Sequence, residues 1–173
     1  MPCVLLVFKK ACQTNIESLV QLCAGPMIHV DIIPVDVRVA YTSYMFESFS
    51  ENTLIGYSPL THVCLRLDVT QHEHDTTAAI LADWVKRGIP YNYPDIFRCI
   101  LPGDCGVCEL LDPASVSTLF CSQAVTLALQ HALDPESILA KAMHALPCRF
   151  TTPNALYNVA LPFAVLDTSL FDQ

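Results

Sequence analysis

The chain has 173 residues, of which 53% are hydrophobic and 15% charged, and its formal net charge is −8. This length suits a single domain spanning 1–173, and the apolar composition excludes a disordered or low-complexity chain. Nine Lys and Arg against seventeen Asp and Glu argue against a nucleic-acid partner, because phosphate contacts need a basic surface.

Strands are expected to dominate the first seventy residues. The apolar run 2–8 predicts a strand and not a signal sequence, since its two lysines follow the run instead of preceding it. Thr14 and Glu17 then match a capping box, and Gly25-Pro26 ends the helix that they open. Further strands are expected at residues 27–33, 35–40, 41–49 and 62–69, with a turn at 51–52.

Helices are expected to dominate the remainder. Asp75 or Thr76 can cap a helix that ends at Gly88, and a loop follows at 90–113. The strongly apolar segment 119–133 predicts a second helix. Asp134-Pro135-Glu136 opens a third that ends at Pro147. After a last strand at 159–166, the order of strands first and helices later indicates an α+β fold with a mainly antiparallel sheet.

The cysteines give an expectation about the cellular compartment, and the hydropathy pattern gives one about membrane spans. Nine cysteines are scattered along the chain, several inside apolar runs, and an odd, dispersed set is not typical of a secreted disulfide scaffold. A reducing, cytoplasmic compartment is therefore expected. No apolar stretch reaches the ~18 residues that a membrane span requires.

Cys121 is the first candidate for chemistry. It lies at the expected start of the apolar helix, where the positive end of the helix dipole stabilises a thiolate. With a neutral imidazole nearby, such a thiol can form an acyl-enzyme. In a chain with nine cysteines, the alternative is a buried structural thiol.

His29 lies within an apolar strand, a rigid position for a general base. Strand alternation places Met27, His29 and Asp31 on one face. Glu47, flanked by aromatic residues, could accept the second imidazole N–H if its strand neighbours that of His29. The alternatives are a histidine satisfied within the core and a solvated acid at a strand edge.

The pair Cys105 and Cys108, with Cys99 nearby and His72 and His74 upstream, raises the question of zinc. Structural zinc usually draws on two ligand pairs with short spacings, and only one clear pair is present. No βαβ pattern surrounds the pair, which disfavours a thioredoxin-like role. Two free thiols in a loop are expected, with no metal and no cofactor.

Five short motifs follow one another along the chain: Ile28-His29-Val30, Phe46-Glu47-Ser48, Gly88-Ile89-Pro90-Tyr91-Asn92, Phe120-Cys121-Ser122-Gln123 and Thr152-Pro153-Asn154-Ala155-Leu156. Their order resembles the circularly permuted branch of the NlpC/P60 superfamily of papain-like proteins, in which the histidine strand precedes the cysteine helix. The resemblance covers roughly Val4 to Leu161. It departs from the family pattern at Ile28, Asp31 and Gln123, where Ser, Gly and an acid are common.

The resemblance implies a permuted papain-like fold and a set of roles. Cys121 would be the nucleophile, His29 the general base and Glu47 the residue that orients it. Gln13 and the backbone N–H of Cys121 would contact the oxyanion or the substrate. The implied reaction is thiol-dependent acyl transfer.

Three functions remain open at this point. A cysteine peptidase or isopeptidase would act on a protein or peptide, such as a ubiquitin-like tail, and the chain is compatible with a viral member working in the host cytoplasm. A lipid acyl hydrolase or acyltransferase would use the same thiol on an ester. The third is a non-enzymatic interaction module, and the oligomeric state is left open.

Overall fold

A six-stranded antiparallel sheet forms the frame of the computed structural model, which describes residues 1–173 apart from 11–14, 38, 45–46, 55, 101–110 and 173. The strand order is β4-β3-β2-β1-β5-β6. The central strand β1 pairs with β5 along its whole length and with β2 from Val4 to Lys9. The strands are β1 (Cys3–Lys9), β2 (His29–Pro34), β3 (Ala40–Thr42), β4 (Ser50–Asn52), β5 (His62–Asp68) and β6 (Val165–Leu166).

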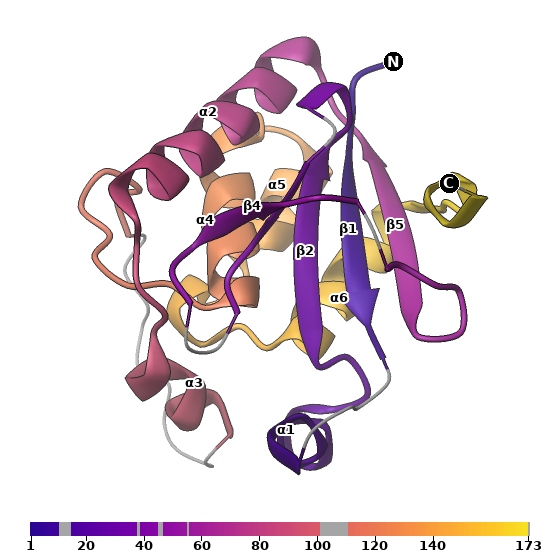
Figure 1. Ribbon diagram of the computed structural model, residues 1–173. Coiled ribbons are helices and arrows are strands. Elements are labelled where there is room, and N and C mark those ends of the chain that lie inside the picture. The colour runs from indigo at the N-terminus through magenta and orange to yellow at the C-terminus, as the bar shows by residue number, and fades with distance from the viewer. Residues whose placement is uncertain (11–14, 38, 45–46, 55, 101–110, 173) are drawn as a thin grey trace.

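Helices gather on one side of this sheet, so the α+β prediction with an antiparallel sheet is confirmed. Helix α4 packs against β2 and against α2, α5 and α6, and Figure 1 shows α4, α5 and α6 behind the sheet, with α1 and α3 below it. The helices are α1 (Asn15–Ala24), α2 (Gln71–Arg87), α3 (Tyr93–Ile100), α4 (Cys121–Ala132), α5 (Ile138–His144) and α6 (Pro153–Ala160).

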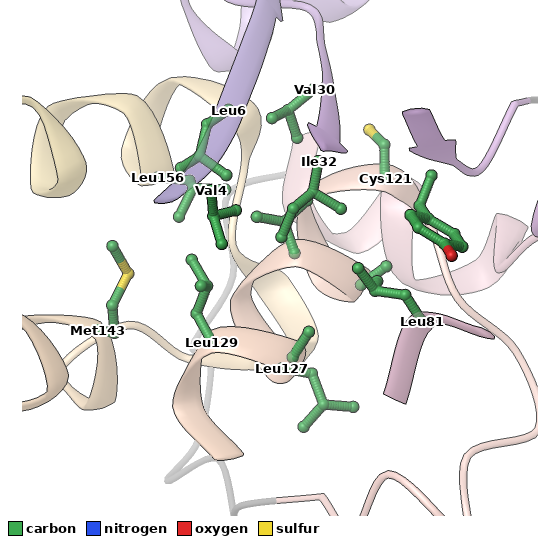
Figure 2. Close-up of a cluster of buried hydrophobic side chains, with 14 of the residues drawn as sticks. Val4, Leu6, Val30, Ile32, Leu81, Cys121, Leu127, Leu129, Met143 and Leu156 are labelled. Atoms are coloured by element: carbon green, nitrogen blue, oxygen red, sulfur yellow. The ribbon is translucent and has the colours of Figure 1, made fainter. Parts of the chain in front are cut away.

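Strand alternation divides the buried side chains between the two faces of the sheet. Val4, Leu6 and Phe8 of β1 are fully buried in the larger cluster, which includes α4 (Figure 2). Burying one such side chain contributes about 1.5–3 kcal/mol. Leu5 and Val7 point to the opposite face and belong to a smaller cluster. His29 and Asp31 alternate with Val30 and Ile32 of the larger cluster, so they lie on the opposite face.

Helix α2 begins earlier than its sequence pattern predicted. Thr70, not Asp75 or Thr76, is the N-cap, and it forms a capping box with Glu73. Glu73 Oε1 also accepts the Asp134 N–H at 2.8 Å, so this carboxylate links the start of α2 to the segment between α4 and α5. The predicted stop at Gly88 is confirmed: its φ of 62° is in the left-handed region, which glycine adopts without strain.

Two strand predictions in the first half are wrong. Residues 35–37 form a 3₁₀ turn directly after Pro34, and β3 holds only residues 40–42 of the two predicted strands at 35–40 and 41–49. The expected turn at 51–52 lies in strand β4, which pairs with β3. Apolar β-branched content alone did not reveal where the chain leaves the sheet.

Three predictions in the second half also need correction. Helix α3 lies inside the expected loop 90–113. The helix expected from Asp134 begins instead at Ile138, because the Ser137 hydroxyl caps the Ala140 N–H. Most of the predicted strand at 159–166 is helix α6 and a 3₁₀ turn, since Thr152 provides a cap and Pro153 occupies the first helical turn.

The sequence contains no apolar stretch long enough for a membrane span, and the helices of the structure can be compared with this prediction. Within the part of the chain that the structure describes, no helix has both the length and the apolar character needed to cross a bilayer.

Candidate functional site

Cys121 is the first residue of α4, and the chain that leads into it is held by backbone pairing. Leu119 forms a parallel bridge with Tyr91, and its carbonyl accepts the Asn92 N–H at 2.9 Å. Phe120 has extended backbone angles, and its N–H donates to Gln123 Oε1 at 3.3 Å. Asn92 Nδ2 donates to the same oxygen at 3.2 Å. These contacts fix the turn at which the helix, and therefore the thiol, begins.

Two serine hydroxyls tie this turn to neighbouring elements. Ser43, directly after β3, donates to the Leu119 carbonyl at 3.0 Å. Ser122, in the first turn of α4, donates to the Thr151 carbonyl at 2.6 Å. Both serines are buried, and a buried hydrogen bond that cannot be replaced by water is costly to lose. The start of α4 is therefore held at a defined position relative to the sheet.

His29 opens β2, and polar contacts surround its imidazole. Its Nε2 lies 2.8 Å from Asp31 Oδ1 and 2.9 Å from Thr42 Oγ1. The Tyr44 ring stacks on it with a centroid separation of 4.5 Å and an interplanar angle of 14°. The side chain is only 11% exposed. Since Nε2 faces Asp31 and Thr42, Nδ1 is the nitrogen available to Cys121.

The structure brings Cys121 and His29 together, although 92 positions separate them in the sequence. Figure 2 shows the Cys121 side chain at one margin of the buried cluster, near Val30 and Ile32 of β2. Burial raises the pKa of the thiol, but the His29 charge and hydrogen bond, with the N–H groups of Val30 and Ser122, lower it overall. The helix dipole acts in the same direction. The sulfur is thus prepared to carry a negative charge.

The pKa of His29 shifts in the opposite direction to that of Cys121. Burial by itself lowers the pKa of the imidazole, but Asp31 and Cys121 outweigh it and raise this pKa to about 10. Burial likewise raises the pKa of Asp31, while the His29 charge and hydrogen bonds from His29, Thr42 and Tyr57 lower it overall. The three shifts therefore favour the same charge states: a thiolate on Cys121, an imidazolium on His29 and a carboxylate on Asp31. The arrangement suits a preformed ion pair for nucleophilic attack.

Asp31, and not Glu47, is the acid that contacts the imidazole. Glu47 is exposed in the chain after β3, and its backbone N–H donates to the Tyr44 carbonyl at 3.1 Å. The assignment of Glu47 required a strand over 41–49 beside β2, and β3 ends at Thr42. The signal that could have found Asp31 was present: residues i and i+2 of one strand share a face, and Asp31 follows His29 at that spacing.

The remaining predicted positions lie apart from this site or cannot be placed. Gln13, Cys105 and Cys108 lie outside the described residues, as does the side chain of Cys99. His72 is exposed on α2, whereas His74 is buried there and its Nδ1 lies 3.1 Å from Asp75 Oδ1. Among the residues that the structure does describe, no group of three or more His, Cys, Asp or Glu side chains is arranged to hold a metal ion.

A cavity of about 440 Å³ adjoins the face of the sheet that carries His29 and Asp31. Two of its walls belong to the site: the Tyr44 ring stacks on His29, and the Tyr57 hydroxyl donates to Asp31 Oδ2 at 2.8 Å. Its described lining is mostly polar and comprises Lys9, Tyr44, Glu47, Asn52, Thr53, Gly56, Tyr57 and His62. The cavity therefore offers hydrogen-bonding groups directly beside the imidazole and its carboxylate.

Comparison with known proteins shows a likeness of fold. No family model matches the chain, and no curated protein matches it significantly. A crystal structure of the metalloprotein yiiX from Escherichia coli O157:H7 is similar, with a TM-score of 0.52 and 13% sequence identity. The similarity covers 98% of this chain and 90% of the other. At this identity the likeness concerns the fold alone, and it extends over nearly the whole of this chain.

Proposed function

We propose that this chain is a thiol-dependent acyl hydrolase in which Cys121 is the nucleophile, His29 the general acid and base, and Asp31 the residue that orients His29. The observation that carries the proposal is the buried chain of contacts from the Cys121 thiol through His29 to the Asp31 carboxylate. The order of its sequence motifs supports a permuted papain-like domain of the NlpC/P60 type.

The proposed reaction begins with the ion pair. The Cys121 thiolate attacks the carbonyl carbon of the substrate, and the carbonyl π electrons move to the oxygen, which becomes an oxyanion. The backbone N–H of Cys121, at the first position of α4, is suited to stabilise that charge. Collapse of the intermediate expels the leaving amine or alcohol, which takes the proton from the His29 imidazolium, and a thioester remains on Cys121.

The second half returns the enzyme to its starting state. His29, now neutral, removes a proton from water, and the resulting hydroxide attacks the thioester carbonyl. The acid product leaves and the thiolate forms again beside the imidazolium. Asp31 holds the ring orientation through both halves, because its Oδ1 contacts Nε2 and leaves Nδ1 for the proton transfers.

A peptide or isopeptide is the substrate class that we favour, with the tail of a ubiquitin-like protein as one form of it. The cavity beside His29 has a mostly polar lining that includes Lys9, Asn52 and Thr53. Such groups can bond to peptide amides, and burying them under an acyl chain would leave them without partners. This observation weighs against the lipid ester.

The test starts with a small activated ester. Wild-type protein is mixed with p-nitrophenyl acetate and digested, and peptide mass spectrometry locates the acetyl group. We expect it on Cys121, and we expect the Cys121→Ala variant to release nitrophenol only at the rate of the uncatalysed reaction. Cys148→Ala, which removes another buried cysteine, is the matched control and should react like wild type.

The substrate classes are then compared on the same preparations. A ubiquitin-like protein with a C-terminal propargyl electrophile should label Cys121, and phosphatidylcholine vesicles should release no fatty acid. Fatty-acid release without peptide labelling would transfer the assignment to the lipid class. If Cys121→Ala is acetylated and turns over as fast as wild type, the assignment of the nucleophile is wrong.

A further inference from the structure

The second oxygen of the Asp31 carboxylate has a partner of its own. Oδ1 faces His29, and Oδ2 accepts a hydrogen bond from the Tyr57 hydroxyl at 2.8 Å. The Asp31 side chain is only 2% exposed, so bulk water cannot replace a lost donor. A buried carboxylate retains its charge only when such hydrogen bonds and charges offset the cost of desolvation. Tyr57 therefore contributes to the state of an acid that in turn acts on His29.

Tyr57 is held in this position by packing on two sides. Its ring lies edge-on to His62 of β5, with centroids 5.2 Å apart and an interplanar angle of 90°. It also packs against the smaller hydrophobic cluster, which contains Leu5 and Val7 of β1. Gly56, immediately before it, has a φ of 93°, a backbone conformation that a side chain would strain. The loop between β4 and β5 thus presents the hydroxyl at a fixed place.

We propose that Tyr57 is a positioning residue of the thiol site: its hydroxyl keeps Asp31 charged and correctly oriented, and Asp31 in turn keeps His29 protonated beside the Cys121 thiolate. The inference rests on the proposed function. It adds that the loop between β4 and β5, which also lines the cavity, controls the strength of the ion pair through one hydroxyl.

Tyr57 is suited to this role because it remains a donor at every pH at which the site would work. Burial, followed by the negative charge of Asp31, raises the pKa of its phenol well above the usual value. A tyrosine that ionised near Asp31 would place two negative charges together, and the same repulsion keeps the proton on the phenol.

Other titratable groups face this pair, and none of them supplies the second hydrogen bond to Asp31 Oδ2. Burial raises the pKa of Tyr44 and raises that of Cys64 to about 12, so both stay neutral. Burial lowers the pKa of His62, which is therefore mostly neutral around pH 7. Three further groups act on the site or its neighbours by charge: Cys121 on His29, Lys9 on His62 and Glu47 on Tyr44.

The experiment removes only the hydroxyl. In Tyr57→Phe, the imidazole titration of His29 is followed by NMR in protein labelled at histidine. The apparent pKa of the Cys121 thiol is read from the rate of iodoacetamide alkylation against pH. We expect the His29 pKa to fall and the Cys121 pKa to rise, each by on the order of one pH unit, because loss of a hydrogen bond to a buried charge has about this effect.

Two controls separate this role from a structural one. Tyr41→Phe removes a buried hydroxyl from β3 that interacts with Glu51, and it should move neither titration. In an Asp31→Asn background the carboxylate charge is absent, so adding Tyr57→Phe should produce less than a third of the shift that it produces alone. The same shift in that background would show that Tyr57 acts by another route, and the proposal would be wrong.

The result also distinguishes this inference from the proposed function. If wild-type Cys121 is alkylated only above pH 8.5 or so, as for an ordinary thiol, the ion pair itself is absent and the proposed function fails. If wild type shows the lowered thiol pKa and Tyr57→Phe leaves it unchanged, only the role of Tyr57 fails. Should Tyr57→Phe fold poorly, Tyr57→Leu also keeps an apolar side chain without a hydrogen-bond donor for Oδ2, and the same shifts are expected.

Discussion

Replacing Asp31 with Asn tests the electrostatic basis of the site most directly. The substitution keeps the size of the side chain but removes its charge and replaces one acceptor oxygen with an NH2 donor. The pKa of His29 rises from an ordinary 6.5 to about 10, which is a net stabilisation of the imidazolium on the order of 5 kcal/mol. Asp31 is the foremost of the groups that raise it. An opposite charge at this distance shifts a pKa by about 1–3 units.

We therefore expect Asp31→Asn to lower the His29 pKa from about 10 to roughly 8. The weaker imidazolium should raise the apparent pKa of the Cys121 thiol by on the order of one unit, since the two groups titrate as a pair. At a pH below the pKa of the thiol, each unit by which this pKa rises lowers the thiolate fraction about tenfold. The alkylation rate falls by the same factor. Acyl transfer should fall by at least as much.

The assay is iodoacetamide alkylation between pH 4 and 10, quantified on the Cys121 peptide because the chain has nine cysteines. Asp36→Asn is the matched control: Asp36 is exposed in the 3₁₀ turn directly after β2, and its loss should leave the profile unchanged. An Asp31→Asn profile that overlays the wild-type profile, with His29 still titrating near 10, would refute the reasoning.

Three further results are expected. Cys121→Ala should lower the His29 pKa below about 10, because the thiolate is one of the charges that raise it. The free energy of unfolding should decline as the pH falls below about 4, because the pKa of Asp31 is lowered on folding and its contribution, present above its unfolded value, is lost as the pH drops through the folded one. Leu129→Ala should destabilise the fold by about 2–5 kcal/mol, since Leu129 is fully buried in the larger cluster.

Each of these has its own measurement. NMR titration of His29 checks the first, with Cys148→Ala as the control that should not move it. Urea unfolding of wild type and Asp31→Asn between about pH 2 and 5 checks the second, and equal losses in both proteins would contradict it. Urea unfolding at neutral pH checks the third, and Leu161→Ala, at a 40% exposed position, should change stability by less than about 0.5 kcal/mol.

Local sequence patterns were sufficient to predict those helices and strands whose hydrophobic period and end signals lie within the element itself. The strand at β1, the helix ending at Gly88 and the apolar helix that starts at Cys121 follow from hydrophobic period and from residues that stop a helix. The errors at 35–49 and 159–166 share a cause. Those segments are apolar enough for strands, but the caps and turns that interrupt them compete with that pattern.

In the candidate site, too, some features follow from the local sequence and others only from the tertiary structure. The sequence by itself determined that Cys121 opens a helix and that His29 lies on a rigid strand with Asp31 on the same face, because these follow from periods of 3.6 and 2. Only the tertiary structure decided that the thiol and the imidazole meet, and that Asp31, not Glu47, contacts Nε2.

The physical reason is that charge states depend on neighbours that are distant along the chain. The acidic composition is visible in the sequence, but the partner of each acid is not. Asp31 is one of seventeen acidic residues in the sequence, and nothing in the sequence alone marks its charge state. Folding buries it between His29, Thr42 and Tyr57, which come from three separate segments. Burial then makes each hydrogen bond and each charge far stronger than it would be in water.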